Sequence, residues 1–121
     1  MRVLVIGLNP STKGGSSKSL KRLYEWMDYL GLSIVSFTNL YETYEIDKTQ
    51  SQIDTIRTVS KEYDKIIALG QVVSGALSRV DIDHCSLPHP SGLNRKLNDK
   101  EYVHKMLEAC KNCLYGRDHV L

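Results

Sequence analysis

The chain has 121 residues, of which 41% are hydrophobic, 25% are charged and 7% are aromatic. These values are typical of a globular protein, and the length is that of one domain that can bury a core without a disulfide or metal. The formal net charge of +2 permits a polyanionic partner, although a dedicated non-specific DNA-binding protein is usually more basic.

Membrane and secretory segments are not expected. No apolar run approaches the roughly 20 residues of a membrane span, and residues 3–8 are too few for a signal peptide. Three cysteines are an odd number, so reduced thiols in a cytoplasmic protein are the simplest interpretation. Cys110 and Cys113 have metal-ligand spacing, but only Cys85 remains as a third thiol. We therefore expect no cluster, no metal and no other cofactor.

Strands and helices alternate along the predicted chain. Short apolar runs, two of them closed directly by glycine, predict strands over residues 2–7, 32–37, 64–69 and 80–87. Apolar residues at helical spacing predict helices over residues 17–30, 53–62 and 71–78. They also predict a last helix, capped by Asn98 or Asp99, whose apolar stripe runs from Val103 to Cys110. This order predicts a single α/β domain over residues 1–121, with a four-stranded parallel sheet between two helical layers and right-handed crossovers.

Three polar segments follow strands and should share one edge of that sheet: residues 7–11, 38–41 and 89–95. In the third segment, Pro88 and Pro90 fix the backbone on either side of His89. Ser91 and Gly92 then allow a close approach of the backbone to a ligand. An ordinary Pro-Gly loop is the alternative reading of this stretch in isolation.

Two of these segments carry a family resemblance. Gly7-Leu8-Asn9-Pro10-Ser11 and His89-Pro90-Ser91-Gly92-Leu93-Asn94-Arg95 resemble the two signature motifs of the uracil-DNA glycosylase superfamily. Asn39 and residues 65–70 are similar to its intermediate segments. An asparagine in the first motif with a histidine in the second most resembles the single-strand-selective and mismatch-directed branches. The likeness covers residues 2 to about 95.

The resemblance implies hydrolysis of the bond between a uracil-like or modified pyrimidine base and deoxyribose, after the base is flipped out of single- or double-stranded DNA. The catalytic residues would be Asn9, which orients the attacking water, and His89, a neutral imidazole that donates a hydrogen bond to the departing base. Asn39 would read the Watson–Crick edge of the base, and Leu8 would line the same base-binding site.

The DNA-binding residues implied by the resemblance come from both motifs. Leu93 would enter the base stack as a wedge and Arg95 would hold a phosphate. Backbone or hydroxyl contacts to DNA would come from the remaining motif residues: Ser11, Ser91, Gly92 and Asn94. The protein would act as a cytoplasmic, nucleoid-associated monomer, and its small size would suit a phage or mobile-element protein.

The segment between the first motif and the second strand is shorter than in the family. That region normally supplies an aromatic ring that stacks on the flipped base, and Tyr24 or Phe37 would have to serve here. Each residue also has an ordinary interpretation: Asn9 as a turn residue, Asn39 as a strand-end cap and Leu93 as a core residue.

Two other functions stay open at this point. The compressed segment would suit a module that binds modified bases or nucleic acid and has lost the chemistry. An enzyme acting on free nucleotides would place its phosphate after the first strand, but the chain lacks a Walker or dinucleotide fingerprint.

Overall fold

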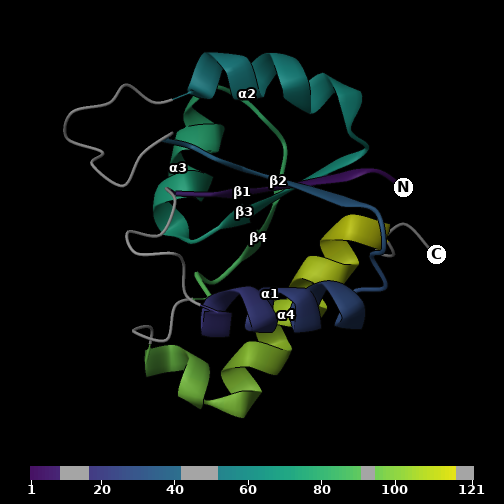
Figure 1. The fold of residues 1–121 in the computed structure, drawn as a ribbon, viewed down its shortest axis with the longest axis vertical. Helices are drawn as coiled ribbons and strands as arrows, with labels where there is room; N and C mark the ends of the chain where they lie inside the picture. The colour runs from purple at the N-terminus through teal and green to yellow at the C-terminus, as the bar shows by residue number, and fades with distance from the viewer. Residues whose placement is uncertain (9–16, 42–51, 91–94, 117–121) are drawn as a thin grey trace.

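The structure is a computed structural model, and it describes residues 1–8, 17–41, 52–90 and 95–116 (Figure 1). Within these ranges the strands are β1 (Val3–Gly7), β2 (Val35–Asn39), β3 (Lys65–Leu69) and β4 (Cys85–Leu87). The α-helices are α1 (Ser17–Tyr29), α2 (Ile53–Val59), α3 (Gln71–Arg79) and α4 (Lys100–Tyr115). Two 3-10 helices, η2 (Ser60–Glu62) and η3 (Arg95–Asn98), adjoin α2 and α4.

The strands form one parallel sheet in the order β2-β1-β3-β4. Val5 pairs with Phe37 of β2 on one side and with Ile67 of β3 on the other, so β1 and β3 are the central strands. Because all strands point the same way, their carboxyl ends lie at one edge of the sheet. The predicted α/β fold with a four-stranded parallel sheet is confirmed.

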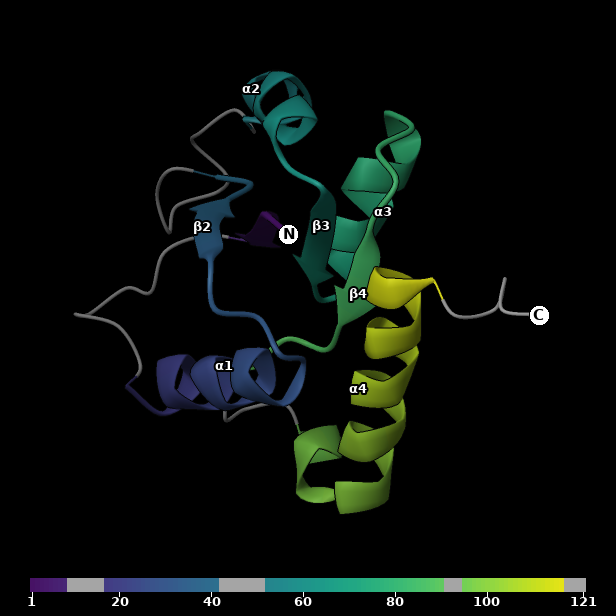
Figure 2. The same ribbon diagram turned by 90° about the vertical axis from the view of Figure 1, so that its right-hand side faces the viewer.

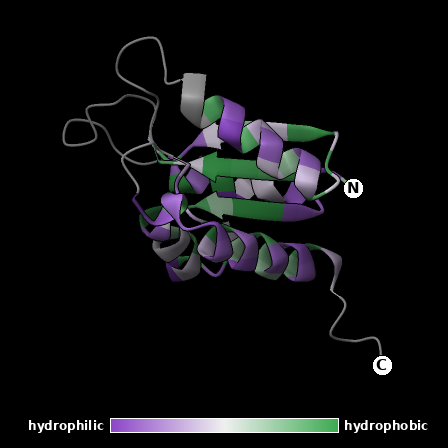
Figure 3. Cartoon of the chain, turned by 90° about the horizontal axis from the view of Figure 1, so that it is seen from below, coloured by the Kyte–Doolittle hydropathy of each residue, from purple (hydrophilic) through white to green (hydrophobic). Residues whose placement is uncertain are grey.

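Helices cover both faces of the sheet (Figure 2). One core lies between the sheet and the α1/α4 layer, and it includes Val5, Trp26, Leu30 and Leu107. The other lies between the sheet and the α2/α3 layer, and it includes Ile6, Ile56 and Leu77. Figure 3 shows the apolar strands between helices that alternate polar and apolar residues. In the described ranges, no helix is both long and apolar enough to cross a bilayer.

Two predicted strand boundaries are wrong. The fourth strand is expected from residue 80, but residues 80–82 close α3 instead and the strand starts at Cys85: Asp81 has a φ of 58°, and the amide of Ile82 donates to the carbonyl of Leu77 at 3.0 Å. Alternating apolar and polar residues therefore do not form a strand where the chain is still finishing a helix. The second strand starts later, at Val35, and extends through Asn39 because it follows β1 to its last residue.

The expectation of three reduced cysteines is also wrong. Cys85, at the start of β4, forms a disulfide with Cys113 in the last turn of α4, and the two Cα atoms are 5.8 Å apart. Cys110 and Cys113 are neighbours in sequence, but the disulfide joins Cys113 to Cys85, 28 positions earlier, because α4 packs across β4. Cys110 stays a buried thiol.

The start of α4 is fixed by a side-chain cap. Asp99 Oδ1 accepts hydrogen bonds from the amides of Glu101 at 3.0 Å and Tyr102 at 3.2 Å. These amides have no partner within the helix, so the carboxylate satisfies donors that would otherwise depend on water. The other end closes at Gly116, which adopts the left-handed conformation.

We expect Asp99→Ala to lower the free energy of unfolding by about 1 kcal/mol, because it removes both capping bonds. Urea denaturation monitored by circular dichroism measures the change. Asp99→Asn is the matched control, because asparagine caps a helix about as well as aspartate. An equal loss in both variants would contradict capping as the cause.

Candidate functional site at the carboxyl edge of the sheet

The described parts of the three predicted polar segments meet at the carboxyl edge of the sheet, as expected. Beyond the last residues of β1 and β2, the amide of Leu40 donates to the carbonyl of Gly7 at 2.8 Å and that of Tyr41 donates to Leu8 at 2.9 Å. At the other side, the amide of Gly70 donates to the carbonyl of Leu87 at 2.8 Å. These bonds hold the segments after all four strands in fixed register.

The strand order makes the gap between β1 and β3 a topological switch point. From β1 the chain crosses to β2 on one side, and from β3 it crosses to β4 on the other side. The connections therefore diverge at the carboxyl ends of the two central strands. In open α/β sheets, ligands bind outside the strands at such a point. Gly7 is the last residue of β1 at this point, and Gly70 is the residue directly after β3.

Gly7 makes room for the side chain of Asn39. The two residues pair across β1 and β2, and a Cβ built on Gly7 would lie only 2.8 Å from Oδ1 of Asn39. Any other residue at position 7 would displace that carboxamide. Gln52 fixes the backbone here. Its side-chain Nε2 donates to the backbone carbonyl of Asn39 at 3.1 Å, and its backbone N–H donates to the carbonyl of Leu40 at 2.7 Å.

Gly70 lies beside His89, and here the backbone conformation rather than a clash requires glycine. It has φ 88° and ψ 163°, a conformation that is essentially restricted to glycine. A Cβ built there would lie 3.5 Å from the Cβ of His89 and 3.9 Å from its Cδ2. The side chain of His89, which comes from beyond the edge strand β4, therefore lies beside the residue that follows the central strand β3.

The side chains of Asn39 and His89 come from the end of β2 and from the segment after β4, the two outer strands. β2 and β4 are three strand spacings apart, about 14 Å. The carboxamide of Asn39 lies against Gly7 of β1, however, and the side chain of His89 lies beside Gly70, directly after β3. Those central strands are only about 5 Å apart. One amide and one imidazole thus lie on either side of the switch point.

The environment of His89 favours its neutral form. Its side chain is exposed overall, but it follows buried Pro88 and precedes buried Pro90. Burial of part of the ring lowers the pKa of His89 below its ordinary value of 6.5, because desolvation disfavours the charged imidazolium. At neutral pH the ring is therefore a neutral group with one N–H donor and one acceptor nitrogen.

Arg22 is a site residue that sequence reasoning missed. Its Nη1 donates to the carbonyl of Pro90 at 3.3 Å and so ties the proline segment to α1, 68 residues earlier in the chain. In the sequence, Arg22 is one of several charged residues on the solvent-facing side of a predicted helix. No spacing distinguishes it from its neighbours.

The two candidate stacking rings lie next to each other. Tyr24 of α1 and Phe37 of β2 meet edge to face, with ring centroids 6.0 Å apart, and are 55% and 43% exposed. Phe37 lies two residues before Asn39 and therefore on the same face of β2. Leu8 instead packs against the core on the α2/α3 side.

Several predicted site residues lie outside the described residues: Asn9, Ser11, Ser91, Gly92, Leu93 and Asn94. Arg95 is described, and it is exposed at the first position of η3. The structure thus brings together Asn39, His89, Tyr24 and Phe37 around one edge of the sheet, with Arg22 as an addition. The pairing of Asn9 with His89 stays a prediction.

A second histidine, His84, has a structural role. Its Nδ1 lies 2.8 Å from the carbonyl of Ile82, which only accepts hydrogen bonds, so Nδ1 carries the proton. Nε2 then accepts from the hydroxyl of Ser74 at 2.7 Å. His84 thereby joins α3 to the segment that leads into β4.

Comparisons with known proteins identify no relative of this chain: no protein-family model, no curated protein and no solved structure matches it.

We expect Gly7→Ala to move the carboxamide of Asn39 while lowering the free energy of unfolding by less than about 1 kcal/mol, because the atom in conflict is the end of a flexible side chain. The side-chain amide resonances of Asn39 in an NMR spectrum report the displacement. Gly75→Ala is the matched control, since a Cβ there meets nothing within 4 Å. Unchanged Asn39 resonances in Gly7→Ala would contradict the contact.

An NMR titration of the His89 ring should give a pKa below 6.5. A lowered folded-state pKa means that the unfolded chain binds the proton more readily, so unfolding is favoured as the solution becomes acidic. The contribution of His89 to stability is therefore complete above pH 6.5 and is lost as the pH falls through the folded-state pKa. His89→Gln identifies the resonance by its disappearance, and a value of 6.5 or higher would contradict the environment described.

Proposed function

We propose that this protein is a DNA glycosylase that hydrolyses the bond between deoxyribose and uracil or a modified pyrimidine. It would act on a base flipped out of DNA, as a monomer in the cytoplasm at the nucleoid. The proposal is supported by the motif resemblance and by the arrangement at the carboxyl edge. The observation that carries it is that Asn39 lies beside Gly7 and His89 beside Gly70, on either side of the switch point.

The reaction needs groups that stabilise developing charge. Breaking the glycosidic bond leaves positive charge on the sugar and negative charge on the departing base. A neutral imidazole suits the second need, because its N–H can donate to a carbonyl oxygen of the base as charge accumulates there. Burial keeps His89 in this form at neutral pH by lowering its pKa. Asn9 would orient the water that attacks the sugar.

Base recognition requires an amide and an aromatic surface. The carboxamide of Asn39 offers one acceptor and two donors, which can pair with the alternating carbonyl and N–H groups on the edge of a pyrimidine. Its backbone is held by Gln52, so the carboxamide approaches from a fixed position. The exposed rings of Tyr24 and Phe37 lie on the same side of the sheet and supply the stacking surface.

Arg22 serves as a positioning residue in this proposal. Its bond to the carbonyl of Pro90 holds the segment after His89 against α1. The same helix carries Tyr24, so α1 connects the stacking surface to the catalytic histidine. Arg95, exposed at the start of η3, would contact a phosphate of the bound DNA.

The proposal is tested with oligonucleotides that carry uracil or hydroxymethyluracil, single- or double-stranded, followed by alkaline cleavage at abasic sites. We expect His89→Ala to lower the rate of base release on the order of 10²–10³-fold, the usual cost of losing such a donor. Asn9→Ala should reduce the rate to a similar degree, because the attacking water loses its orientation.

Matched controls come from α4, away from the carboxyl edge. His104→Ala and Asn112→Ala replace exposed residues of the same types and should leave the rate unchanged. Absence of abasic sites with every substrate would overturn the proposed activity. Tight, salt-sensitive binding of the same oligonucleotides without product would indicate a base-binding module of the same fold instead.

A further inference from the structure

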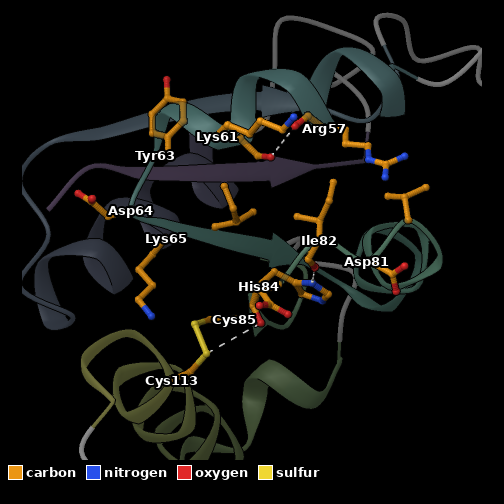
Figure 4. A pocket seen from close by; sticks show the side chains of 14 residues that line it. Arg57, Lys61, Tyr63, Asp64, Lys65, Asp81, Ile82, His84, Cys85 and Cys113 are labelled. Carbon is orange, nitrogen blue, oxygen red and sulfur yellow. Dashed lines mark hydrogen bonds between the residues drawn. A yellow bond between two sulfur atoms is a disulfide. The ribbon is translucent and has the colours of Figure 1, made fainter.

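A second feature lies at the opposite, amino-terminal edge of the sheet. A cavity of about 740 Å³ opens between the end of α2, the start of β3, the segment before β4 and the last turn of α4 (Figure 4). Both Cys85 and Cys113 line it, and Figure 4 shows their disulfide in its wall. The disulfide therefore faces a space large enough to admit a small molecule.

The two cysteines of the disulfide differ in exposure. Cys85 is 3% exposed, because it sits in the core beneath α4, whereas Cys113 is an exposed residue. Thiol–disulfide exchange requires a thiolate to reach one sulfur, so attack at Cys113 is favoured. The carbonyl of His84 lies 3.9 Å from the Sγ of Cys113 and is placed to accept a hydrogen bond from the thiol once the disulfide opens.

The third cysteine does not compete in this exchange. Cys110 lies one helical turn before Cys113 but is 1% exposed. Burial raises its pKa to about 12, so it stays protonated and is not a nucleophile at neutral pH. Exchange is thereby confined to the pair that lines the cavity.

The charge of the cavity also admits an anionic thiolate. Its lining includes three basic and three acidic side chains: Arg57, Lys61, Lys65, Asp64, Asp81 and Asp83. The backbone amide of Arg2 donates to the carboxylate of Asp64 at 2.6 Å, which engages one of the negative charges. An entering thiolate therefore meets no net negative charge.

We propose that this cavity is a thiol–disulfide exchange site, in which a low-molecular-weight thiol forms a mixed disulfide with Cys113. The incoming thiolate bonds to the Sγ of Cys113, the bond between the two cysteines breaks, and its electron pair leaves on the Sγ of Cys85, which takes a proton from water. A second thiolate then attacks the sulfur of the bound small thiol. The Cys113 thiolate leaves, and the two small thiols depart joined as a disulfide. Overall, two thiols are oxidised to one disulfide and the protein disulfide is reduced to two thiols.

The exchange would control how firmly α4 is joined to β4. The disulfide joins two residues that are 28 positions apart in sequence. The chain between them contains His89, η3 and most of α4. When it opens, the last turn of α4 loses its covalent link to β4, and β4 leads directly into Pro88 and His89. This step does not depend on the proposed function, because the link is a property of the fold.

The test uses the air-oxidised full chain and reduced glutathione as the small thiol. Mass spectrometry of the acid-quenched protein should show one adduct, located on Cys113 by peptide mapping. Amide hydrogen exchange should become at least tenfold faster for residues 112–116 after reduction, with the amides of α2 unchanged as the internal control. Neither measurement requires glycosylase activity, so a failure here is distinguishable from a failure of the proposed function.

Variants that each lack one of the three cysteines distinguish the reactivity of Cys113 from that of Cys85. In Cys85→Ala, Cys113 should react with glutathione disulfide at least tenfold faster than Cys85 does in Cys113→Ser, whereas Cys110→Ala should give the same adduct as the parent. If one variant does not fold, the adduct on the parent chain still decides the matter. An adduct on Cys85 or Cys110, a disulfide that is reduced only in urea, or three free thiols after air oxidation would overturn the proposal.

Discussion

The candidate site depends on two glycines at the carboxyl ends of the central strands. At Gly7, the last residue of β1, a Cβ would lie 2.8 Å from Oδ1 of Asn39, so glycine leaves the space that this carboxamide occupies. At Gly70, directly after β3, the backbone has a φ of 88°, which favours glycine, and the side chain of His89 lies beside it. The parallel sheet supplies the common edge, and these two positions lie next to the amide and the imidazole on it.

The two edges of the sheet carry different groups. At the carboxyl edge, polar and aromatic groups are held by hydrogen bonds that continue past the strands and by the bond from Arg22 to Pro90. At the amino edge, the Cys85–Cys113 disulfide joins β4 to α4 beside a cavity. β4 is only three residues long, so the disulfide and the histidine segment are close in sequence although they face opposite ends.

The sequence is sufficient to predict what depends on local pattern. Helical spacing and apolar runs located the four α-helices and four strands of the described residues, and the polar segments after strands indicated the shared edge. What depends on tertiary packing was not predictable: residues 80–82 alternate like a strand yet close α3, Arg22 looks like any solvent-facing residue of its helix, and Cys85 and Cys113 meet only because α4 crosses β4. Asn39 was identified from its place after a strand, but its contact with Gly7 was not.

In the proposed function, the neutral state of His89 suits a reaction in which negative charge develops on the group that it contacts. A protonated imidazole at this partly buried position would be costly, which is why burial lowers the pKa of His89. The neutral ring forms only a modest hydrogen bond with an uncharged carbonyl, and a stronger one as that oxygen becomes anionic. An interaction that strengthens between ground state and transition state accelerates a reaction, whereas one of constant strength only tightens binding. In the proposed function, the departing pyrimidine is the group on which that charge develops.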